Sequence, residues 1–306
     1  MKAAYFMRNG GPEVFEYGDV PNPLAGEGQV LVDVHAASVN AADWKTRLGH
    51  NRPTTTFPYI LGRDFSGVVS ALGEGVKDFK VGDEVFGVTE QRGGDQCYAE
   101  KVAISAAIVA KKPDTLAHIE AAAVGLIGLT AIVAIEDTLK LKRGETILIQ
   151  GGAGGVASFA VQLATHIGAR VITTASAANR DYVRSLGADE VIDYNAQDFT
   201  KVVSGCDAVF DTVGGDVATR SFEVLRPHGR AAFISGAAPV PPRDDIASLK
   251  PQVGRDRAHL QRIVELVTSG AVRVPEINVY SLSEAAAAHR VSEGRHFRGK
   301  LVFKVR

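Results

Sequence analysis

The sequence predicts an α/β protein that combines a doubly wound parallel sheet with a separate, barrel-like domain of short antiparallel strands. Residues 146–234 alternate short apolar runs with helical segments, which is the pattern of a parallel sheet. Residues 1–118 instead carry many short β-like runs separated by glycine turns. The length of 306 residues exceeds one typical domain and suits two.

The most informative segment is 146–157, where an apolar run leads directly into a cluster of glycines. The spacing is Gly152-x-Gly154-x-x-Ala157, and an amphipathic helical segment, 158–167, follows it. A strand, a glycine turn and a helix start form a pyrophosphate site, because the free N–H groups and positive dipole end of the helix attract negative charge. Alone, this string is also compatible with an ordinary glycine-rich loop.

The segments that follow favour the dinucleotide interpretation. A second strand at a βαβ distance and a continued alternation predict a doubly wound sheet around the glycine turn. The expected elements are strand 170–174, a helix ending at Gly187, strand 190–192, strand 208–210, helix 217–225 and strand 230–234.

The residues after the second strand indicate which dinucleotide is bound. An NAD site places Asp or Glu there to bind the ribose hydroxyls, but the first acid is Asp181, already in helical sequence. Polar and basic side chains suited to a 2′-phosphate stand there instead, so NADPH is predicted over NADH. These side chains are Ser176, Asn179, Arg180 and, after the third strand, Tyr194. The alternative for Arg180 is an exposed helix charge.

The two domains are expected at 1–118, completed by 275–306, and at 119–274. Strands are expected at 29–36, 67–71 and 80–86, and a helix at 120–140, interrupted around 125–128. At the C-terminus, a helix at 283–293 and a strand at 300–305 are expected to complete the β-rich domain.

Composition predicts a cytoplasmic enzyme. The net charge of −1 gives no electrostatic basis for binding nucleic acid or an anionic membrane. We expect neither an apolar run long enough to span a bilayer nor a signal peptide. Two cysteines, Cys97 and Cys206, do not suggest a disulfide framework.

Motifs along nearly the whole chain resemble those of the medium-chain dehydrogenase/reductase superfamily, within it the zinc-free quinone oxidoreductases and enone reductases. The resemblance implies a GroES-like N-terminal domain that carries catalytic residues, a Rossmann domain that binds NADPH, a quinone or enone substrate and a possible homodimer. The motifs are 1–3, 38–45, 62–69, 82–87, 128–131, 151–157, 186–194, 211–214 and 298–302.

The resemblance also predicts that no metal is bound. Zinc alcohol dehydrogenases carry Cys where this chain has Asn40, and His-Glu where it has Arg63 and Asp64. The thiolate and imidazole ligands of a catalytic zinc are therefore missing, and only Cys97 lies where structural zinc would need four cysteines. Asp43 remains, and a structural hydrogen bond is its expected role.

Without zinc, a conjugated acceptor is easier to reduce than a simple carbonyl, because a few hydrogen-bond donors can stabilise an enolate. The matching motif positions imply Lys45 as the charged donor, in contact with both NADPH and substrate, and Asn40 as a neutral donor. The alternatives are a turn-capping Asn40 and a solvated Lys45. Trp44, the only tryptophan, is expected either to line the pocket or to pack in the core.

The resemblance assigns further cofactor contacts position by position. Gly154, Gly155 and Val156 match pyrophosphate contacts, while Thr130 and Ile234 match residues near the nicotinamide and its ribose. Arg298, Gly299 and Lys300 match a C-terminal segment that closes over the cofactor, although Lys300 is equally compatible with a strand-edge charge.

Two further points stay open. Segment 246–254 replaces a strongly apolar strand that pairs across a dimer in related proteins, and Pro251 removes a ladder donor. A non-catalytic NADPH-binding redox sensor and an enoyl-thioester reductase remain alternative functions.

Overall fold

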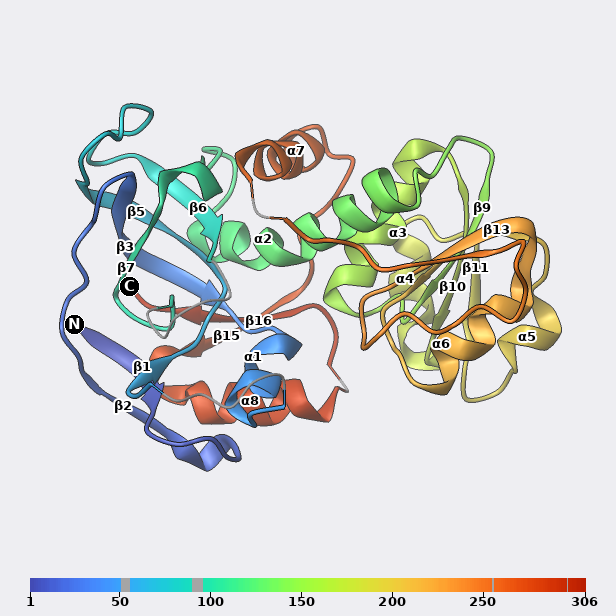
Figure 1. Cartoon of the computed structure of the whole chain (residues 1–306), viewed down its shortest axis with the longest axis horizontal. Helices are drawn as coiled ribbons and strands as arrows, with labels where there is room; N and C mark the ends of the chain where they lie inside the picture. The colour runs from blue at the N-terminus through green and yellow to red at the C-terminus, as the bar shows by residue number, and fades with distance from the viewer. Residues whose placement is uncertain (51–55, 90–95, 255, 296) are drawn as a thin grey trace. The chain divides into compact units, whose positions relative to one another are not determined.

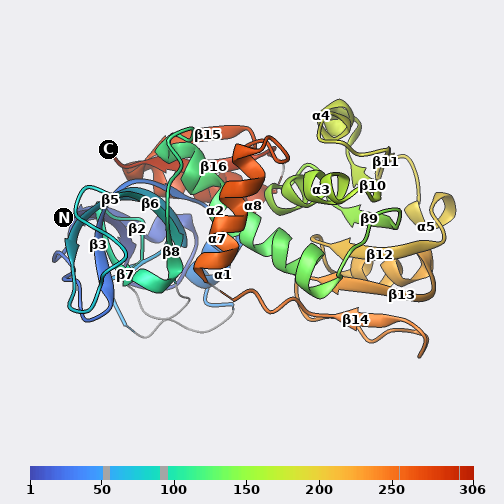
Figure 2. The same cartoon turned by 90° about the horizontal axis from the view of Figure 1, so that it is seen from above.

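The computed structural model describes residues 1–50, 56–89, 96–254, 256–295 and 297–306 (Figures 1 and 2). The chain forms two compact units, described separately below. The first comprises Met1–Leu126, Arg255–Thr268 and Val274–Arg306, and the second comprises Ile127–Gly254 and Ser269–Arg273. Compared with the boundaries expected from sequence, the first unit also includes residues 119–126 and Arg255–Thr268.

The second unit is built on a six-stranded sheet in the order β11-β10-β9-β12-β13-β14, and every neighbouring pair is parallel. The order reverses between β9 and β12, so the predicted doubly wound Rossmann sheet is confirmed. The strands are β9 (Thr146–Gln150), β10 (Arg170–Ala175), β11 (Glu190–Asp193), β12 (Cys206–Asp211), β13 (Leu225–Phe233) and β14 (Ala247–Leu249); the helices are α3 (Gly155–Ile167), α4 (Arg180–Ser185), α5 (Phe199–Val202) and α6 (Asp216–Arg220).

The helix expected over 217–225 is wrong in its second half. Helix α6 ends at Arg220, a short 3-10 turn covers Ser221–Val224, and Leu225 already begins β13. Phe222, Val224 and Leu225 are buried around an exposed Glu223, and so short a segment has no periodicity that separates helix from strand.

Strand β14 lies at the edge of this sheet and pairs with β13. Pro251 lies beyond the last residue of β14, Leu249, so it removes no donor from the strand itself. The homodimer stays a prediction.

The first unit is the predicted β-rich domain. One sheet has the order β2-β1-β4, and a larger one runs β15-β16-β3-β5-β6-β8 with β7 also on β3. Strand β16 pairs with β3, so the end of the chain completes the N-terminal sheet. The strands are β1 (Lys2–Phe6), β2 (Phe15–Asp19), β3 (Gln29–Ser38), β4 (Tyr59–Ile60), β5 (Asp64–Leu72), β6 (Glu84–Val88), β7 (Lys101–Ser105), β8 (Val109–Lys111), β15 (Ile277–Ser281) and β16 (Lys300–Lys304).

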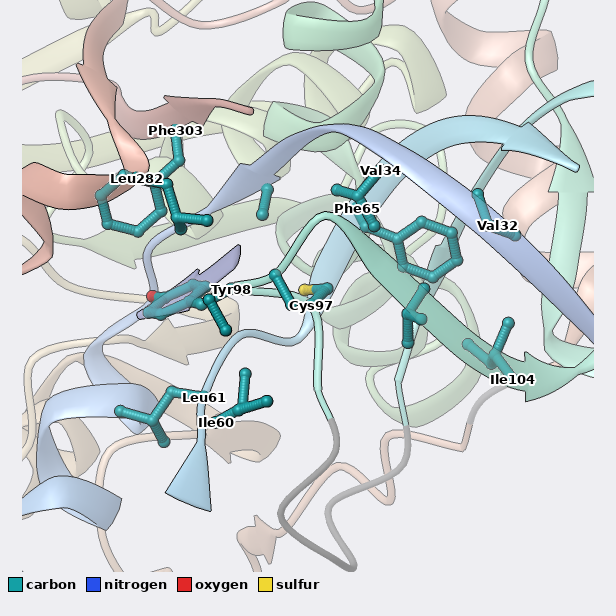
Figure 3. Packing of buried hydrophobic residues seen from close by; sticks show 14 of the residues in the cluster. Val32, Val34, Ile60, Leu61, Phe65, Cys97, Tyr98, Ile104, Leu282 and Phe303 are labelled. Atoms are coloured by element: carbon teal, nitrogen blue, oxygen red, sulfur yellow. The ribbon is translucent and has the colours of Figure 1, made fainter. Parts of the chain in front are cut away.

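The helices of this unit are α1 (Ala41–Arg47), most of α2 (His118–Ile132), α7 (Arg257–Thr268) and α8 (Ala285–Gly294). The core lies between the strands and includes Phe65, Tyr98 and Phe303, all fully buried (Figure 3). The Tyr98 and Phe303 rings pack edge to face with centroids 4.8 Å apart.

The interruption expected at 125–128 is wrong, because α2 runs continuously to Ile132 and then widens into a π-helical turn over Val133–Thr138. A Cβ on Gly125 would lie 3.0 Å from the Cβ of Asp64, so this glycine permits close packing against β5. The segment His118–Thr138 has 21 residues, and an 18-residue window of it has a mean hydropathy of 1.9, so it is long and apolar enough to span a membrane. The expectation that no run reaches this length is therefore wrong, although 78% of the apolar window is buried, as in a core helix.

Candidate active site

The glycine turn of the second unit connects β9 to α3. Gly151 has a φ of +80°, and a Cβ on Gly152 would lie 2.3 Å from the Oγ1 of Thr173, so both positions need glycine. Gly154 is exposed and precedes α3, whose first residues are Gly155 and Val156. The N–H groups of the first helical turn have no intrahelical acceptor and are free for an anion, so the turn fits a pyrophosphate.

Buried polar side chains at the ends of the neighbouring strands hold this turn in place. The Gly151 N–H donates to the Oγ1 of Thr174 (3.0 Å), and that hydroxyl donates to the Oε1 of Gln150 (2.7 Å). The Gln150 amide in turn donates to the Oγ of Ser221 (3.2 Å). Neither Gln150 nor Ser221 was identified from the sequence, although Gln150, a polar residue that ends an otherwise apolar strand, was a usable signal.

The four residues predicted to select NADPH all follow the carboxyl ends of β10 and β11. The Asn179 amide donates to the Oγ of Ser176 (3.2 Å), and the Tyr194 N–H donates to the Ala175 carbonyl (3.4 Å). Arg180 begins α4 and is exposed, and its side chain pairs with no carboxylate of the part of the chain described. Its charge is thus available to a ligand. The structure gathers these side chains at the same end of the sheet as the glycine turn.

The two nicotinamide candidates also belong to the second unit. Thr130 lies within α2 and is 8% exposed. Ile234 follows β13, and its N–H donates to the Asp211 carbonyl (3.1 Å) at the carboxyl end of β12. Ile234 therefore lies at the edge of the sheet where the glycine turn stands.

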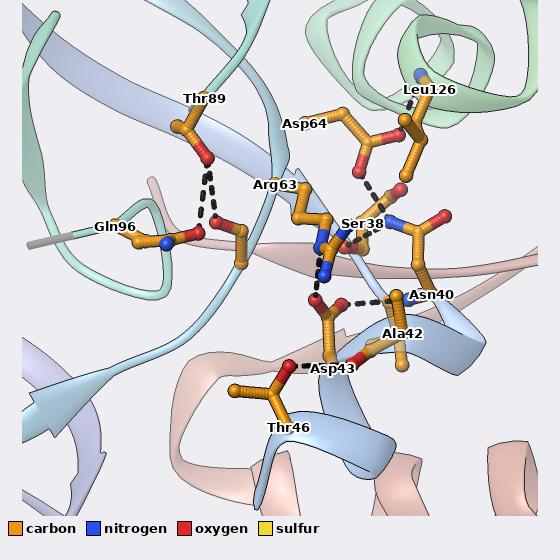
Figure 4. A network of polar contacts seen from close by, with 12 residues as sticks. Ser38, Asn40, Ala42, Asp43, Thr46, Arg63, Asp64, Thr89, Gln96 and Leu126 are labelled. Carbon is orange, nitrogen blue, oxygen red and sulfur yellow. Dashed lines mark hydrogen bonds and ion pairs between the residues drawn. The ribbon is translucent and has the colours of Figure 1, made fainter. Parts of the chain in front are cut away.

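In the first unit, Asn40 precedes α1 and forms its N-cap. Its N–H donates to the Oδ2 of Asp43 (2.9 Å), which fixes the start of the helix (Figure 4). Its side-chain amide donates to the Oδ1 of Asp64 (2.6 Å) and, at 3.4 Å, to the Ser38 carbonyl. The side-chain oxygen accepts from the ammonium of Lys300 (2.7 Å). Asn40 therefore caps the helix and also joins a buried polar network.

The three C-terminal candidates all have protein partners. Lys300 is 4% exposed, and its ammonium also donates to the Val39 carbonyl (2.9 Å), so it is not an exposed strand-edge charge. Burial lowers its pKa, while Asp64 and Asp43 oppose that shift. Arg298 pairs with Glu276 at 2.8 Å, and a Cβ on Gly299 would lie 2.0 Å from the Glu276 carbonyl oxygen. Their cofactor roles stay predictions.

Asp43 has the structural role expected of it. Its Oδ2 accepts from Asn40 and from the Tyr98 hydroxyl (2.9 Å), and its Oδ1 lies 3.5 Å from the Nε of Arg63. Complete burial raises the pKa of this carboxyl to about 6, although Arg63 opposes the shift. Within the described ranges, no group of three or more His, Cys, Asp or Glu side chains is placed to hold a metal ion.

Lys45 lies on the last turns of α1, beside Trp44. The Trp44 side chain is 7% exposed, so packing in the core is its observed role. The Lys45 ammonium lies 5.6 Å from the centre of the Trp44 ring. Partial burial lowers the pKa of Lys45, and the charge of Arg295 lowers it further. Arg295 was not identified from the sequence, although three cations within 295–300 were a visible signal.

Comparisons with known proteins agree with this architecture. Residues 26–114 match the family described as alcohol dehydrogenase GroES-like domain, and residues 186–303 match the family described as zinc-binding dehydrogenase. A chloroplastic quinone oxidoreductase of Triphysaria versicolor is 32% identical over 312 residues, which cover 96% of this chain and 94% of the relative. At 35% identity, the chain spans 64% of the length of the 2-methylene-furan-3-one reductase of Solanum lycopersicum.

Solved structures extend the likeness to the whole fold. The quinone oxidoreductase of Coxiella burnetii superposes with a TM-score of 0.94 at 37% identity, covering 100% of this chain and 99% of that one. The Escherichia coli quinone oxidoreductase complexed with NADPH gives a TM-score of 0.90 at 27% identity, covering 100% of both chains. The chain therefore belongs to the medium-chain dehydrogenase/reductase superfamily. Within it, the chain falls in the quinone oxidoreductase branch and is an oxidoreductase.

Proposed function

We propose that this protein reduces quinones or α,β-unsaturated carbonyls with NADPH and without zinc. The observation that carries the proposal is the Asn40–Asp64–Lys300 network. Asn40 and Asp64 stand at positions where zinc alcohol dehydrogenases have ligands, and both are engaged in hydrogen bonds, Asn40 to Asp64 and to Lys300. The network offers neither the thiolate nor the imidazole of a catalytic zinc site, so an acceptor that needs only hydrogen-bond donors suits it.

The cofactor proposal rests on the second unit. The N–H groups of Gly155 and Val156 would hold the pyrophosphate, and the free charge of Arg180 would hold the 2′-phosphate with Ser176 and Tyr194. Two relatives support NADPH by their names. They are the chloroplastic NADPH-dependent alkenal/one oxidoreductase of Arabidopsis thaliana, 32% identical over 313 residues, and the E. coli enzyme solved with NADPH.

When bound, NADPH would supply a hydride to the β-carbon of an enone or to a quinone. In an enone, the pair of the carbon–carbon double bond would then form the double bond of the enolate while the pair of the carbonyl bond moves to oxygen, and water would supply the proton that completes reduction. Lys45 donates to that oxygen as charge develops. Asn40 is the second donor. Its 3.4 Å bond to the Ser38 carbonyl is the weaker of its two amide bonds, so that N–H is the one able to turn to the oxyanion.

Stopped-flow oxidation of NADPH with a panel of enones and quinones tests the activity. Turnover of at least one acceptor class is expected. Binding without any turnover would favour the non-catalytic redox sensor instead.

Arg180→Ala tests the cofactor assignment. One charge-assisted phosphate contact contributes about 1.5–3 kcal/mol, so NADPH binding should weaken by roughly 10- to 100-fold while NADH binding stays unchanged. The matched control is Asp181→Ala, at the neighbouring position on α4. In this control the preference for NADPH over NADH should stay higher than in Arg180→Ala. Equal weakening of both cofactors by Arg180→Ala would rule out its role.

A further inference from the structure

Two cations approach the same indole ring in the first unit. The Lys45 ammonium lies 5.6 Å from the centre of the Trp44 ring, and the central carbon of the Arg295 guanidinium lies 5.5 Å from it. Lys45 belongs to α1, while Arg295 directly follows α8, so residues distant in sequence bring two positive charges to one place.

Three other arginines of this unit have carboxylate partners. Arg47 pairs with Glu293, and the Arg63–Asp43 and Arg298–Glu276 pairs are described above. Lys45 and Arg295, by contrast, pair with no carboxylate among the residues that the structure describes. The indole face alone neutralises neither charge, because the ring attracts a cation only through its quadrupole and carries no net charge. The remaining charge would be neutralised best by an anion from outside the chain.

The fold fixes the relative position of the two backbone segments that carry these side chains. Arg47 on α1 bonds to Glu293 and, at 3.3 Å, to the Nδ1 of His289, both on α8. Arg295 then adopts a left-handed conformation with a φ of +55°, and its N–H donates to the Ser292 carbonyl (3.3 Å). A left-handed arginine is uncommon and ends α8 at this point. The pair of cations is therefore held by secondary structure on both sides.

We propose that Lys45 and Arg295 form an anion subsite on Trp44, and that the natural acceptor is an unsaturated carbonyl compound bearing a carboxylate. This proposal rests on the proposed function and adds the substrate class to it. A carboxylate accepts from both a guanidinium and an ammonium, which no neutral enone or quinone can match in strength. A phosphate group of the cofactor has the same chemistry, and the test must separate it from the substrate.

The kinetic test compares β-acetylacrylate with its neutral methyl ester as acceptors. In the unaltered enzyme, kcat/KM should be higher for the acid. Arg295→Gln should lower kcat/KM for the acid by about 5- to 20-fold, through a higher KM. This range is modest because Arg295 is exposed and solvent weakens its charge. The kcat/KM for the ester and the Kd of NADPH should stay unchanged. Arg290→Gln removes an equal charge from the exposed face of α8 and should change neither substrate.

A binding test does not require turnover. Trp44 is the only tryptophan, so intrinsic fluorescence reports directly on this subsite. Titration with levulinate should change the Trp44 emission saturably, and methyl levulinate at equal concentrations should not. Arg295→Gln should abolish the levulinate response, and Arg295→Lys, which keeps the charge, should retain most of it.

These outcomes separate the proposal from the function on which it rests. Equal kcat/KM for acid and ester, with no emission change, would overturn the subsite and leave the reductase standing. A saturable levulinate response without turnover of any acceptor would support the subsite and overturn the reductase. If Arg295→Gln raises the Kd of NADPH and lowers kcat/KM equally for the acid and the ester, the cations belong to the cofactor site and the proposal is contradicted.

Discussion

The Asp43→Asn substitution tests the buried network that positions α1. Asp43 is fully buried, and its pKa is raised to about 6, with burial as the largest cause. The folded protein therefore holds a proton on Asp43, between pH 4 and 6, that the unfolded chain has released. The contribution of Asp43 to stability must fall as pH rises through this window, because at this group the folded state binds more protons than the unfolded chain.

The magnitude follows from the size of the shift. A rise from 3.8 to about 6 corresponds to about 3 kcal/mol that the ionised carboxyl costs the folded protein at neutral pH. An amide has no such cost, and its oxygen still accepts from Asn40 and Tyr98. The attraction to Arg63 acts only on the ionised carboxyl and is already contained in the raised pKa, so its loss adds no separate pH dependence. Relative to the unaltered protein, Asp43→Asn should gain about 3 kcal/mol between pH 4 and pH 7.5.

Urea unfolding at a series of pH values measures this difference. His289, whose pKa is lowered to about 3 by burial, makes stability rise with pH, but it is present in both proteins and cancels. Asp198→Asn is the control of opposite sign, because a hydrogen bond from Thr200 lowers the pKa of that exposed carboxyl. If the free energies of unfolding of Asp43→Asn and the unaltered protein differ by a constant amount across this range, the buried-carboxyl reasoning is wrong.

Two further predictions concern the reaction. Lys45→Met keeps the apolar length of the side chain but removes its donor, so kcat should fall by roughly 10²- to 10³-fold if Lys45 acts in the transition state. A higher Kd for NADPH with unchanged kcat would instead limit Lys45 to binding cofactor, and no change in either would remove it from the site. Activity should also survive chelation, since Asn40 and Arg63 are not zinc ligands; stoichiometric zinc with activity lost on its removal would contradict this.

The second unit could be predicted well because its signals are local. The glycine turn, its strand and its helix are contiguous in sequence, and the alternation of elements fixes a parallel sheet. The errors arose where local signals mislead. Glycine is a residue type that often interrupts helices, yet Gly125 permits close packing against Asp64. Only the tertiary contact reveals this role.

The polar network of the first unit could not be predicted in the same way. The hydrogen bond between Lys300 and Asn40 joins residues 260 positions apart, and β16 must pair with β3 before the two meet. Family resemblance placed Asn40 and Lys300 in the site, but it did not indicate that they bond to each other. Arg295 was missed for the same reason, since its proximity to Trp44 depends on how α8 packs beside α1.

The structure nevertheless separates the roles of the two lysines that the sequence placed together. The ammonium of Lys300 is buried, and it donates to the Val39 carbonyl and to Asn40, so a reacting oxygen would have to compete with two existing bonds. Lys45 donates to no acceptor among the described residues and is only partly buried. Breaking a buried bond costs about 1–3 kcal/mol, whereas an unused donor requires no such exchange. We therefore propose Lys45 as the lysine that responds to charge developing on the substrate, whereas Lys300 bonds to Asn40 and holds it in place.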